Sequence, residues 1–146
     1  MFFEVLGQPQ GKQRARVTIR GGFAKAYTPE KTASYENLIM LSFVTALRGK
    51  QTPFWECALE ITIKAFYVIP KSFSKKKQIE ALNCTLRPAK KPDIDNVVKC
   101  VCDALNKVAY KDDTQVIRLS AEKYYGNEPK LIIELKELNP GGFYER

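Results

Sequence analysis

The alternation of apolar and polar residues predicts β-strands in several parts of the chain. It is clearest between Leu59 and Tyr67, where every second residue is apolar, and it ends before Pro70. Because successive side chains of a strand point to opposite faces, such a stretch indicates a strand with one buried face. The same criterion, with turn residues at the boundaries, predicts the remaining strands: residues 1–6, a hairpin of 16–20 and 23–27 turned at Gly21-Gly22, 117–125 and 131–138.

Three other stretches show the 3.6-residue spacing of helices. The first begins at Thr28-Pro29, which suit the N-cap and the first helical position, and it stops at Gly49. Ser74 is the expected cap of a short basic helix, and a third helix is expected over residues 96–107. Together the elements predict an α+β fold: a single two-layer domain in which helices pack on a mixed sheet of about five strands.

The composition is that of one globular domain. The chain has 146 residues, of which 45% are apolar, enough for a core that needs no disulfide or structural metal. We expect the domain to span residues 1–138 and residues 139–146 to form a flexible tail. No run of 18 apolar residues occurs, and the first residues lack the pattern of a signal peptide. A cytoplasmic protein without a membrane span is therefore expected.

Cysteine and histidine usage narrows the possible chemistry. The cysteines, Cys57, Cys84, Cys100 and Cys102, show no C-x-x-C spacing, so we expect them to be reduced and mostly buried. The sequence contains no histidine. Nucleophilic Ser-His and Cys-His arrangements and most zinc sites are therefore excluded, and carboxylates, lysine and metal-bound water remain as candidate catalysts.

Basic residues gather in two parts of a chain whose net charge is +8. Residues 71–91 hold seven of them against one acid, and residues 1–25 hold five against one. Solvated faces that aid solubility would explain either cluster alone, whereas two clusters beside an acidic site favour a nucleic-acid partner. The predicted phosphate-contacting residues are Lys12, Arg14, Arg16, Lys75, Lys76, Lys77, Arg87, Lys90 and Lys91.

Every aspartate of the chain lies within residues 93–113. Carboxylates concentrated on a basic protein suggest a hard divalent cation, because Mg²⁺ takes oxygen ligands and is commonly shared with substrate phosphates. We expect an extended Asp93-Ile94-Asp95, with both carboxylates on one face and Ile94 in the core. Asp113 can join them if residues 107–112 run back along the helix, or a partner chain can supply the acid.

Further polar residues follow along the expected third helix. Lys99 lies one turn after Asp95, so its ammonium group can reach toward a bound phosphate. Asp103, one turn further, either orients Lys99 or is an ordinary surface acid. Asn96 is a candidate helix cap, and Asp112 is either a supporting ligand or a turn residue.

The complete string of motifs resembles the RusA family of Holliday junction resolvases. It runs Lys91-Pro-Asp-Ile-Asp-Asn-Val-Val-Lys99, then Asp103-Ala-Leu105, then Asp112-Asp-Thr-Gln-Val116, and it is preceded by Gly7-Gln-Pro9 and a basic segment. The resemblance implies a homodimeric endonuclease that nicks opposed strands of four-way DNA junctions with Mg²⁺ or Mn²⁺. It assigns metal binding to Asp93, Asp95 and Asp113 and an essential catalytic role to Lys99.

The chain departs from the family pattern at the end of the third helix, where Lys107 replaces a usual glycine. Two other functions stay open: a nuclease for other branched DNA, and a non-catalytic DNA-binding module whose aspartates only cap and turn the chain. Exposed aromatic residues would stack on unpaired bases, but core packing is the preferred interpretation for the candidates, which are Trp55, Phe2, Phe3, Phe66 and Tyr67.

Overall fold

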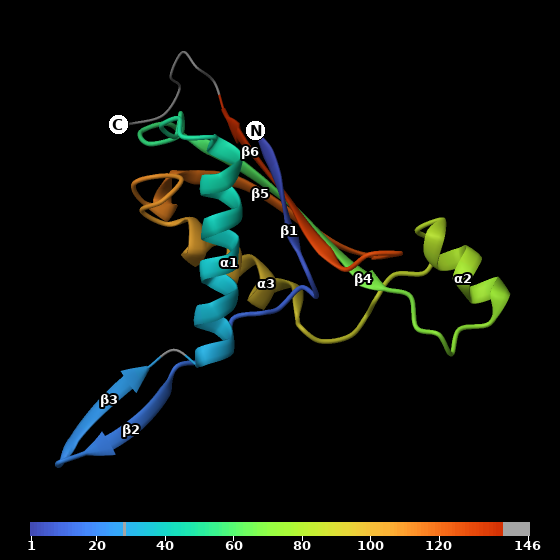
Figure 1. The fold of residues 1–146 in the computed structure, drawn as a ribbon, viewed down its shortest axis with the longest axis horizontal. Helices are drawn as coiled ribbons and strands as arrows, with labels where there is room; N and C mark the ends of the chain where they lie inside the picture. The colour runs from blue at the N-terminus through green and yellow to red at the C-terminus, as the bar shows by residue number, and fades with distance from the viewer. Residues whose placement is uncertain (28, 139–146) are drawn as a thin grey trace.

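The computed structural model describes residues 1–27 and 29–138 and shows an α+β fold (Figure 1). Thr28, the expected N-cap, and the expected tail of residues 139–146 lie outside the described residues. The elements in chain order are β1 (Phe2–Leu6), β2 (Arg16–Arg20), β3 (Phe23–Tyr27), α1 (Glu30–Leu47), β4 (Leu59–Val68), α2 (Lys75–Leu82), α3 (Ile94–Leu105), the 3₁₀ turn η1 (Asp113–Gln115), β5 (Val116–Gly126) and β6 (Lys130–Glu137).

The main sheet is mixed and has four strands in the order β1-β6-β4-β5. Strand β4 lies inside it, antiparallel to β6 and parallel to β5. The mixed sheet is confirmed, but its expected size of about five strands is not, since β2 and β3 form a separate hairpin. All ten residues of that hairpin are exposed, so neither of its faces packs against the main sheet.

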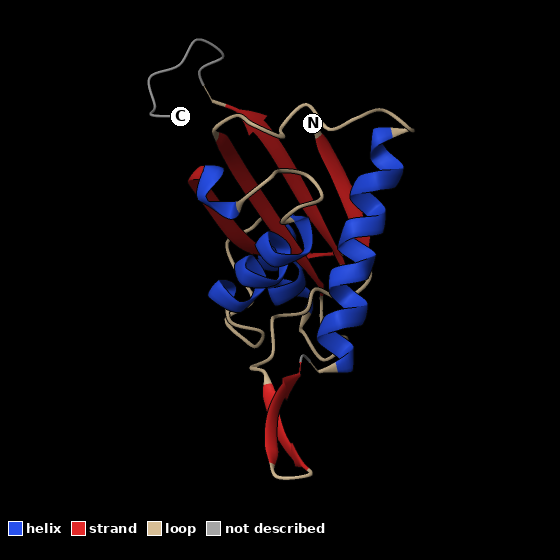
Figure 2. Ribbon diagram, turned by 90° about the vertical axis from the view of Figure 1, so that its left-hand side faces the viewer, coloured by secondary structure: helices blue, strands red, loops and turns tan. Residues whose placement is uncertain are grey.

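One face of the main sheet is covered by α1 and α3 (Figure 2). The inward row of β4, which includes Ile61, Ile63 and Tyr67, is fully buried, as the alternation predicts. From the helices, Ile39 and Val101 are equally buried against it. The core therefore lies between one sheet face and two helices, which is the expected two-layer arrangement.

The helix ends follow the sequence signals in part. The Ser74 hydroxyl accepts a hydrogen bond from the Lys77 amide at 3.3 Å and so caps α2 as expected. Helix α3 begins at Ile94, two residues earlier than expected, because the Asp93 carbonyl already accepts from the Val97 amide at 3.2 Å. All four cysteines are free; Cys100 is buried and Cys84 is exposed.

Residues 69–115 connect the parallel strands β4 and β5 and contain all five aspartates. This connection forms α2, which stands away from the sheet, and then α3, which packs on it (Figure 1). The β2–β3 hairpin projects from another side of the molecule, next to the start of α1 (Figure 2). The aspartate-bearing helix therefore lies between two projecting arms.

Lys107 follows α3 with a backbone φ of 59°, in the left-handed region. Any residue other than glycine is strained at such an angle, because its Cβ crowds the following carbonyl oxygen. The chain nevertheless turns at this point, with the Ala109 amide donating to the Leu105 carbonyl at 2.8 Å. The departure from the family glycine thus falls on a position whose backbone favours glycine.

Replacing Lys107 by glycine should raise the free energy of unfolding by about 1 kcal/mol, because it relieves the left-handed strain. Urea denaturation followed by circular dichroism measures the change. Lys107→Ala is the matched control, since it removes the same charge and keeps a Cβ. Equal stability of the two variants would show that the backbone angle is not the cause.

Candidate functional site

The first turn of α3 carries Asp93 and Asp95. Asp93 occupies the N-cap position with an extended backbone (φ −64°, ψ 147°), and Asp95 lies in the first helical turn. The expected extended Asp93-Ile94-Asp95 is therefore wrong. Ile94 begins the helix and is 36% exposed, since the buried face of α3 starts at Val97. Both carboxylates lie on residues that are exposed to solvent.

Lys99 and Asp103 continue along α3 from Asp95 at intervals of four residues, which places them on adjacent turns of one side. The Lys99 ammonium donates to Asp103 Oδ1 at 3.1 Å, and the Lys99 side chain is 61% exposed. Asp103 thus orients Lys99, and the ammonium group keeps most of its surface for another ligand.

Asp103 also binds a second cation. Its Oδ2 lies 2.8 Å from the Lys12 ammonium, which donates in addition to Glu36 on α1 at 2.7 Å. Partial burial acts to raise the pKa of Asp103, but hydrogen bonds from Lys12 and Lys99 outweigh it and hold the pKa below its ordinary value. Burial likewise opposes the charge of Lys12, yet Asp103 and Glu36 raise its pKa. Lys12, a predicted phosphate contact, is therefore engaged within the protein.

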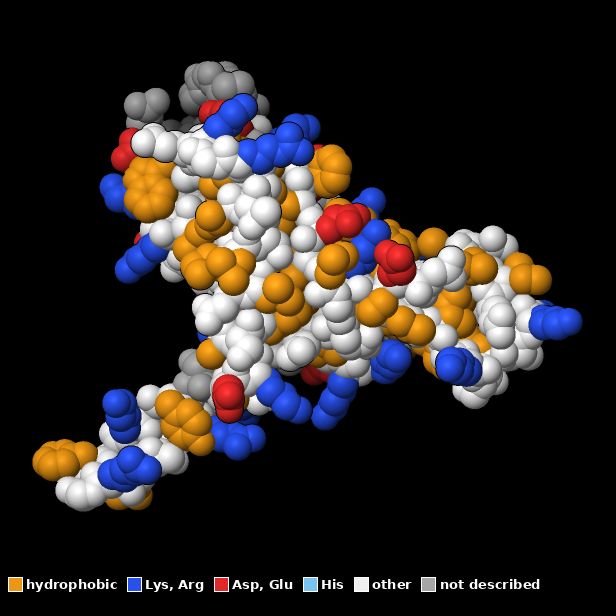
Figure 3. Space-filling view, viewed as in Figure 1, with side chains coloured by type: hydrophobic (Ala, Val, Ile, Leu, Met, Phe, Trp, Pro, Cys, Tyr) orange, Lys and Arg blue, Asp and Glu red, His pale blue; other side chains and the backbone are white. Residues whose placement is uncertain are grey.

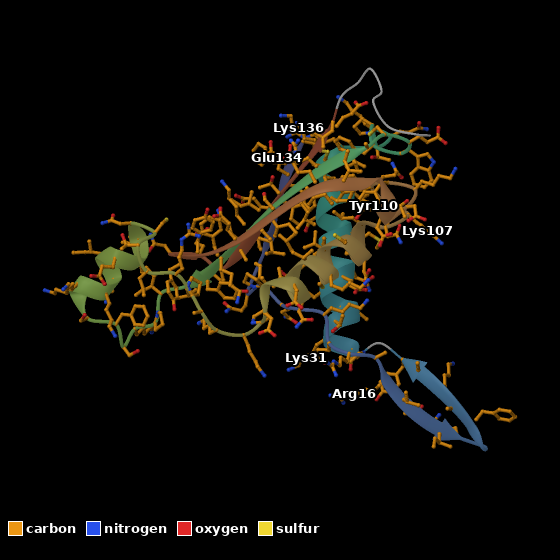
Figure 4. All side chains as sticks on the ribbon, turned by 180° about the vertical axis from the view of Figure 1, so that it is seen from behind. Arg16, Lys31, Lys107, Tyr110, Glu134 and Lys136 are labelled. Atoms are coloured by element: carbon orange, nitrogen blue, oxygen red, sulfur yellow. The ribbon has the colours of Figure 1, made fainter. Side chains whose placement is uncertain are left out.

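The loop before β2 packs closely on the start of α3. The Lys12 amide donates to the Asn96 carbonyl at 2.9 Å. A Cβ on Gly11 would lie 2.8 Å from the Asn96 Cβ and 2.9 Å from the Pro92 Cβ, so only glycine fits without a shift. This loop, Asp93 and Lys31 at the start of α1 line one open hollow. Figure 4 shows where Lys31 lies.

Asp112 has a structural role at the start of η1. Its carboxylate accepts from the Thr114 amide at 3.1 Å, and this backbone hydrogen bond is the main cause that lowers the pKa of Asp112. The Gln115 side chain completes a capping box by accepting from the Asp112 amide at 3.0 Å. Of the two roles expected for Asp112, the geometry supports the turn residue.

Gln115 fixes the loop that carries Asp113. Its side-chain oxygen also accepts from the Lys111 amide at 2.9 Å. Its side-chain nitrogen donates to the carbonyls of Phe54 and Cys57 at 3.1 and 2.8 Å. One amide group therefore ties the Asp113 loop to the segment before β4.

The chain returns toward α3 through a tight turn rather than through extended residues. Tyr110 is buried, and its hydroxyl donates to the Cys102 carbonyl at 3.0 Å (Figure 4). Burial raises the pKa of Cys102, with Asp103 and Asp113 adding to the shift and Lys99 opposing it. The turn therefore brings Asp113 back toward α3, within electrostatic range of Cys102.

The structure does not bring the three predicted metal-binding carboxylates together in one chain. Within residues 1–27 and 29–138, no group of three acidic or cysteine side chains is placed to hold a metal ion. The same residues supply no salt bridge to Asp93, Asp95 or Asp113. Exposed carboxylates without a cationic partner are chemically suited to Mg²⁺, so the donor set fits the ion that the resemblance implies.

The basic residues of the connection divide into exposed and engaged ones. Lys75, Lys76 and Lys77 on α2 and Lys91 before α3 are exposed. Arg87 is also exposed, but it stacks over the Tyr124 ring, 3.9 Å from its centroid, and donates to the Cys84 and Lys123 carbonyls. Figure 3 shows that Lys and Arg side chains gather along the concave edge between the β2–β3 hairpin and α2.

Sequence reasoning missed Gly11, Glu36 and Gln115, which position the site without being candidates for its chemistry. Gln115 belongs to the Asp-Asp-x-Gln motif, and its spacing of three residues after Asp112 is a capping signal that could have indicated its role. No local signal marks Gly11 or Glu36, because Gly11 packs against Asn96, 85 residues away on α3, and Glu36 binds Lys12, 24 residues away in the loop before β2.

An acidic helix end, a nearby exposed lysine and basic projecting arms are together typical of proteins that act on nucleic acid. The model of the endodeoxyribonuclease RusA family matches residues 7–136, and the chain belongs to this family. A curated relative, the uncharacterized protein YqaN of Bacillus subtilis (strain 168), is 35% identical over 139 residues, which cover 94% of this chain and 96% of the relative. No helix in the described part of the chain has the length and hydropathy to cross a bilayer.

Substituting Gln115 by glutamate should lower the free energy of unfolding by about 1–3 kcal/mol, because two buried carbonyls lose their donor and face a negative charge. Chemical denaturation measures this loss. Gln51→Glu, the same change at an exposed glutamine, should be nearly neutral. Similar losses in both variants would contradict the structural role of Gln115.

Asp103→Asn should destabilise the fold near neutral pH, by no more than about 1 kcal/mol because the ion pairs are partly exposed. The pKa of Asp103 is lowered in the fold, so its contribution is present above the ordinary value of 3.8 and disappears as the pH falls through the lowered pKa. Thermal unfolding between pH 2 and pH 7 should therefore show the two proteins converging at acid pH. A difference independent of pH would contradict the ion-pair explanation, and the exposed Glu128→Gln serves as the control.

Proposed function

We propose that the chain is a metal-dependent endodeoxyribonuclease that resolves four-way DNA junctions by paired nicks and acts as a homodimer. One observation carries this proposal. Of the five aspartates, Asp103 is bound by two lysines and Asp112 caps a turn. The three without such a role, Asp93, Asp95 and Asp113, are the three that the family resemblance matches to metal-binding carboxylates.

Asp93, Asp95 and Asp113 would hold Mg²⁺, with Mn²⁺ as a substitute. A bound divalent ion would lower the pKa of water and offset the charge of the scissile phosphate, which suits a protein without histidine. Within the described residues, no group of three such side chains is placed to hold a metal ion. The full ligand set would therefore be completed by movement of the Asp113 loop or by a carboxylate from the partner subunit.

Lys99 would stabilise the negative charge that builds up on the phosphate during cleavage. Its ammonium group is a compact cation, held from one side by Asp103 and exposed on the other. Asp103 acts as a positioning residue in this scheme. Its second ion pair, to Lys12, links the position of Lys99 to the loop that precedes the hairpin.

The basic surfaces support DNA as the substrate. Exposed basic residues occur on α2 and at Lys91, and also in and just before the hairpin at Arg16 and Arg14. The hairpin and α2 are the two arms between which α3 lies (Figure 1). Side chains of this kind bind the phosphate backbone and do not read bases. A homodimer would present two such sites related by two-fold symmetry, which matches two equivalent strands of a four-way junction.

Cleavage of four-way, three-way and linear DNA with Mg²⁺ tests the proposal. Lys99→Ala should lower the single-turnover rate on four-way junctions by about 10²–10³-fold while junction affinity changes little. Asp95→Asn should abolish metal-dependent cleavage and leave its exposed helix turn folded. The control, Lys75→Glu combined with Lys76→Glu, should weaken binding and retain the rate at saturating protein.

Four outcomes would overturn parts of this proposal. Equal rates on linear duplex would exclude junction selectivity, and faster cleavage of three-way DNA would favour another branched substrate. Undiminished cleavage by Asp95→Asn would reject the metal-binding role of Asp95, and no cleavage by the wild type would favour the non-catalytic DNA-binding module.

A further inference from the structure

The β2–β3 hairpin has two chemically different faces. In the antiparallel register Arg16 lies opposite Tyr27, and Arg20 lies opposite Phe23. Directly opposed residues share a face of a two-stranded ribbon, and alternate residues along each strand do as well. One face therefore carries Arg16, Thr18, Arg20, Phe23, Lys25 and Tyr27, and the other carries Val17, Ile19, Ala24 and Ala26.

Neither face is buried by the rest of the chain that the structure describes. Every residue of both strands is exposed, and Phe23 has the largest exposed fraction, 81%, among the large hydrophobic residues that the structure describes. An isolated two-stranded hairpin is at best marginally stable in water. Its fully exposed aromatic residue therefore indicates that the hairpin is completed by a partner.

The charge of the hairpin indicates what the partner is. Residues 5–29 contain five Lys and Arg residues and no acid. Cations that alternate with aromatic rings on one face combine phosphate contacts with stacking surfaces, which is the chemistry of binding to unpaired nucleotides. A protein partner would instead favour the aliphatic face, which has no charge.

The root of the hairpin is tied to the candidate site. The Gln13 amide donates to the buried Thr32 hydroxyl at 3.2 Å, and the neighbouring Lys12 binds Asp103 and the Asn96 carbonyl. Figure 4 shows Arg16 at this root, close to Lys31. Five residues of strand reach about 17 Å. The turn at the tip can therefore contact DNA well beyond the base pairs next to the carboxylates.

We propose that this hairpin probes the branch point of the DNA substrate. Phe23 at the tip stacks on a base that has lost its neighbour at the branch, and Arg16, Arg20 and Lys25 contact the flanking phosphates. The inference rests on the proposed action on branched DNA and adds a binding element that distinguishes a branch from continuous duplex.

Fluorescence anisotropy without divalent ions measures binding to a labelled four-way junction and to a linear duplex of the same sequence. Phe23→Ala should weaken junction binding about 5- to 150-fold, the range for loss of one stacked base, and change duplex binding by less than about 2-fold. Phe23→Trp should restore junction binding. With 2-aminopurine at the branch, the wild type should change the fluorescence of that base and Phe23→Ala should not.

Ile19→Thr is the matched control, because it changes the aliphatic face of the hairpin and introduces another β-branched residue. It should leave the junction affinity and the 2-aminopurine fluorescence change as they are in the wild type. Junction binding by Phe23→Ala that equals the wild type would overturn the inference. So would an equal defect in Ile19→Thr accompanied by loss of the dimer, which would make the hairpin a protein-docking arm. Cleavage of junctions without dependence on Phe23 would reject only the hairpin inference, whereas Phe23-dependent binding without cleavage would reject only the catalytic function.

Discussion

The parallel pairing of β4 with β5 is the constraint on which the rest of the molecule depends. Two parallel neighbours cannot be joined by a tight turn, so the chain must leave one end of the sheet and return to the other. Residues 69–115 make this crossing. The crossing covers one face of the sheet with α3 and leaves α2 outside. The core, the acidic helix end and a basic arm thus arise from one topological requirement.

Within the crossing, some aspartates are bound by lysines or backbone amides and stabilise the fold, whereas the others have no cationic partner among the described residues. Asp103 gives one oxygen to each of two lysines and so joins the N-terminal loop to α3, with Glu36 adding a link to α1. Asp112 is engaged by backbone amides. The remaining carboxylates are held in place by their helix turn or by the Gln115 loop and not by cations. The acids that stabilise the fold are therefore different from the acids that stay accessible to a ligand. This division allows the site to stay negatively charged on a basic protein.

Local patterns predicted most of the elements and much less of their assembly. The alternation in β4, the Gly21-Gly22 turn and the Ser74 cap each depend on residues a few positions apart, and each agrees with the structure. The extended Asp93-Ile94-Asp95 failed because alternation over three residues does not distinguish a strand from the first turn of a helix. The contacts of Lys12 with Asp103 and of Arg87 with Tyr124 could not be predicted, because the partners are distant in sequence.

The order of strands in the main sheet also bears on how the chain folds. Strand β1 pairs only with β6, so residues 2–6 find their partners at residues 130–134. Closing so large a loop is entropically costly and slow, whereas the β2–β3 hairpin needs only residues adjacent in the chain. During synthesis this edge of the sheet cannot close until residues 130–134 have left the ribosome. The first strand is therefore exposed to competing contacts for longer than any other part of the sheet.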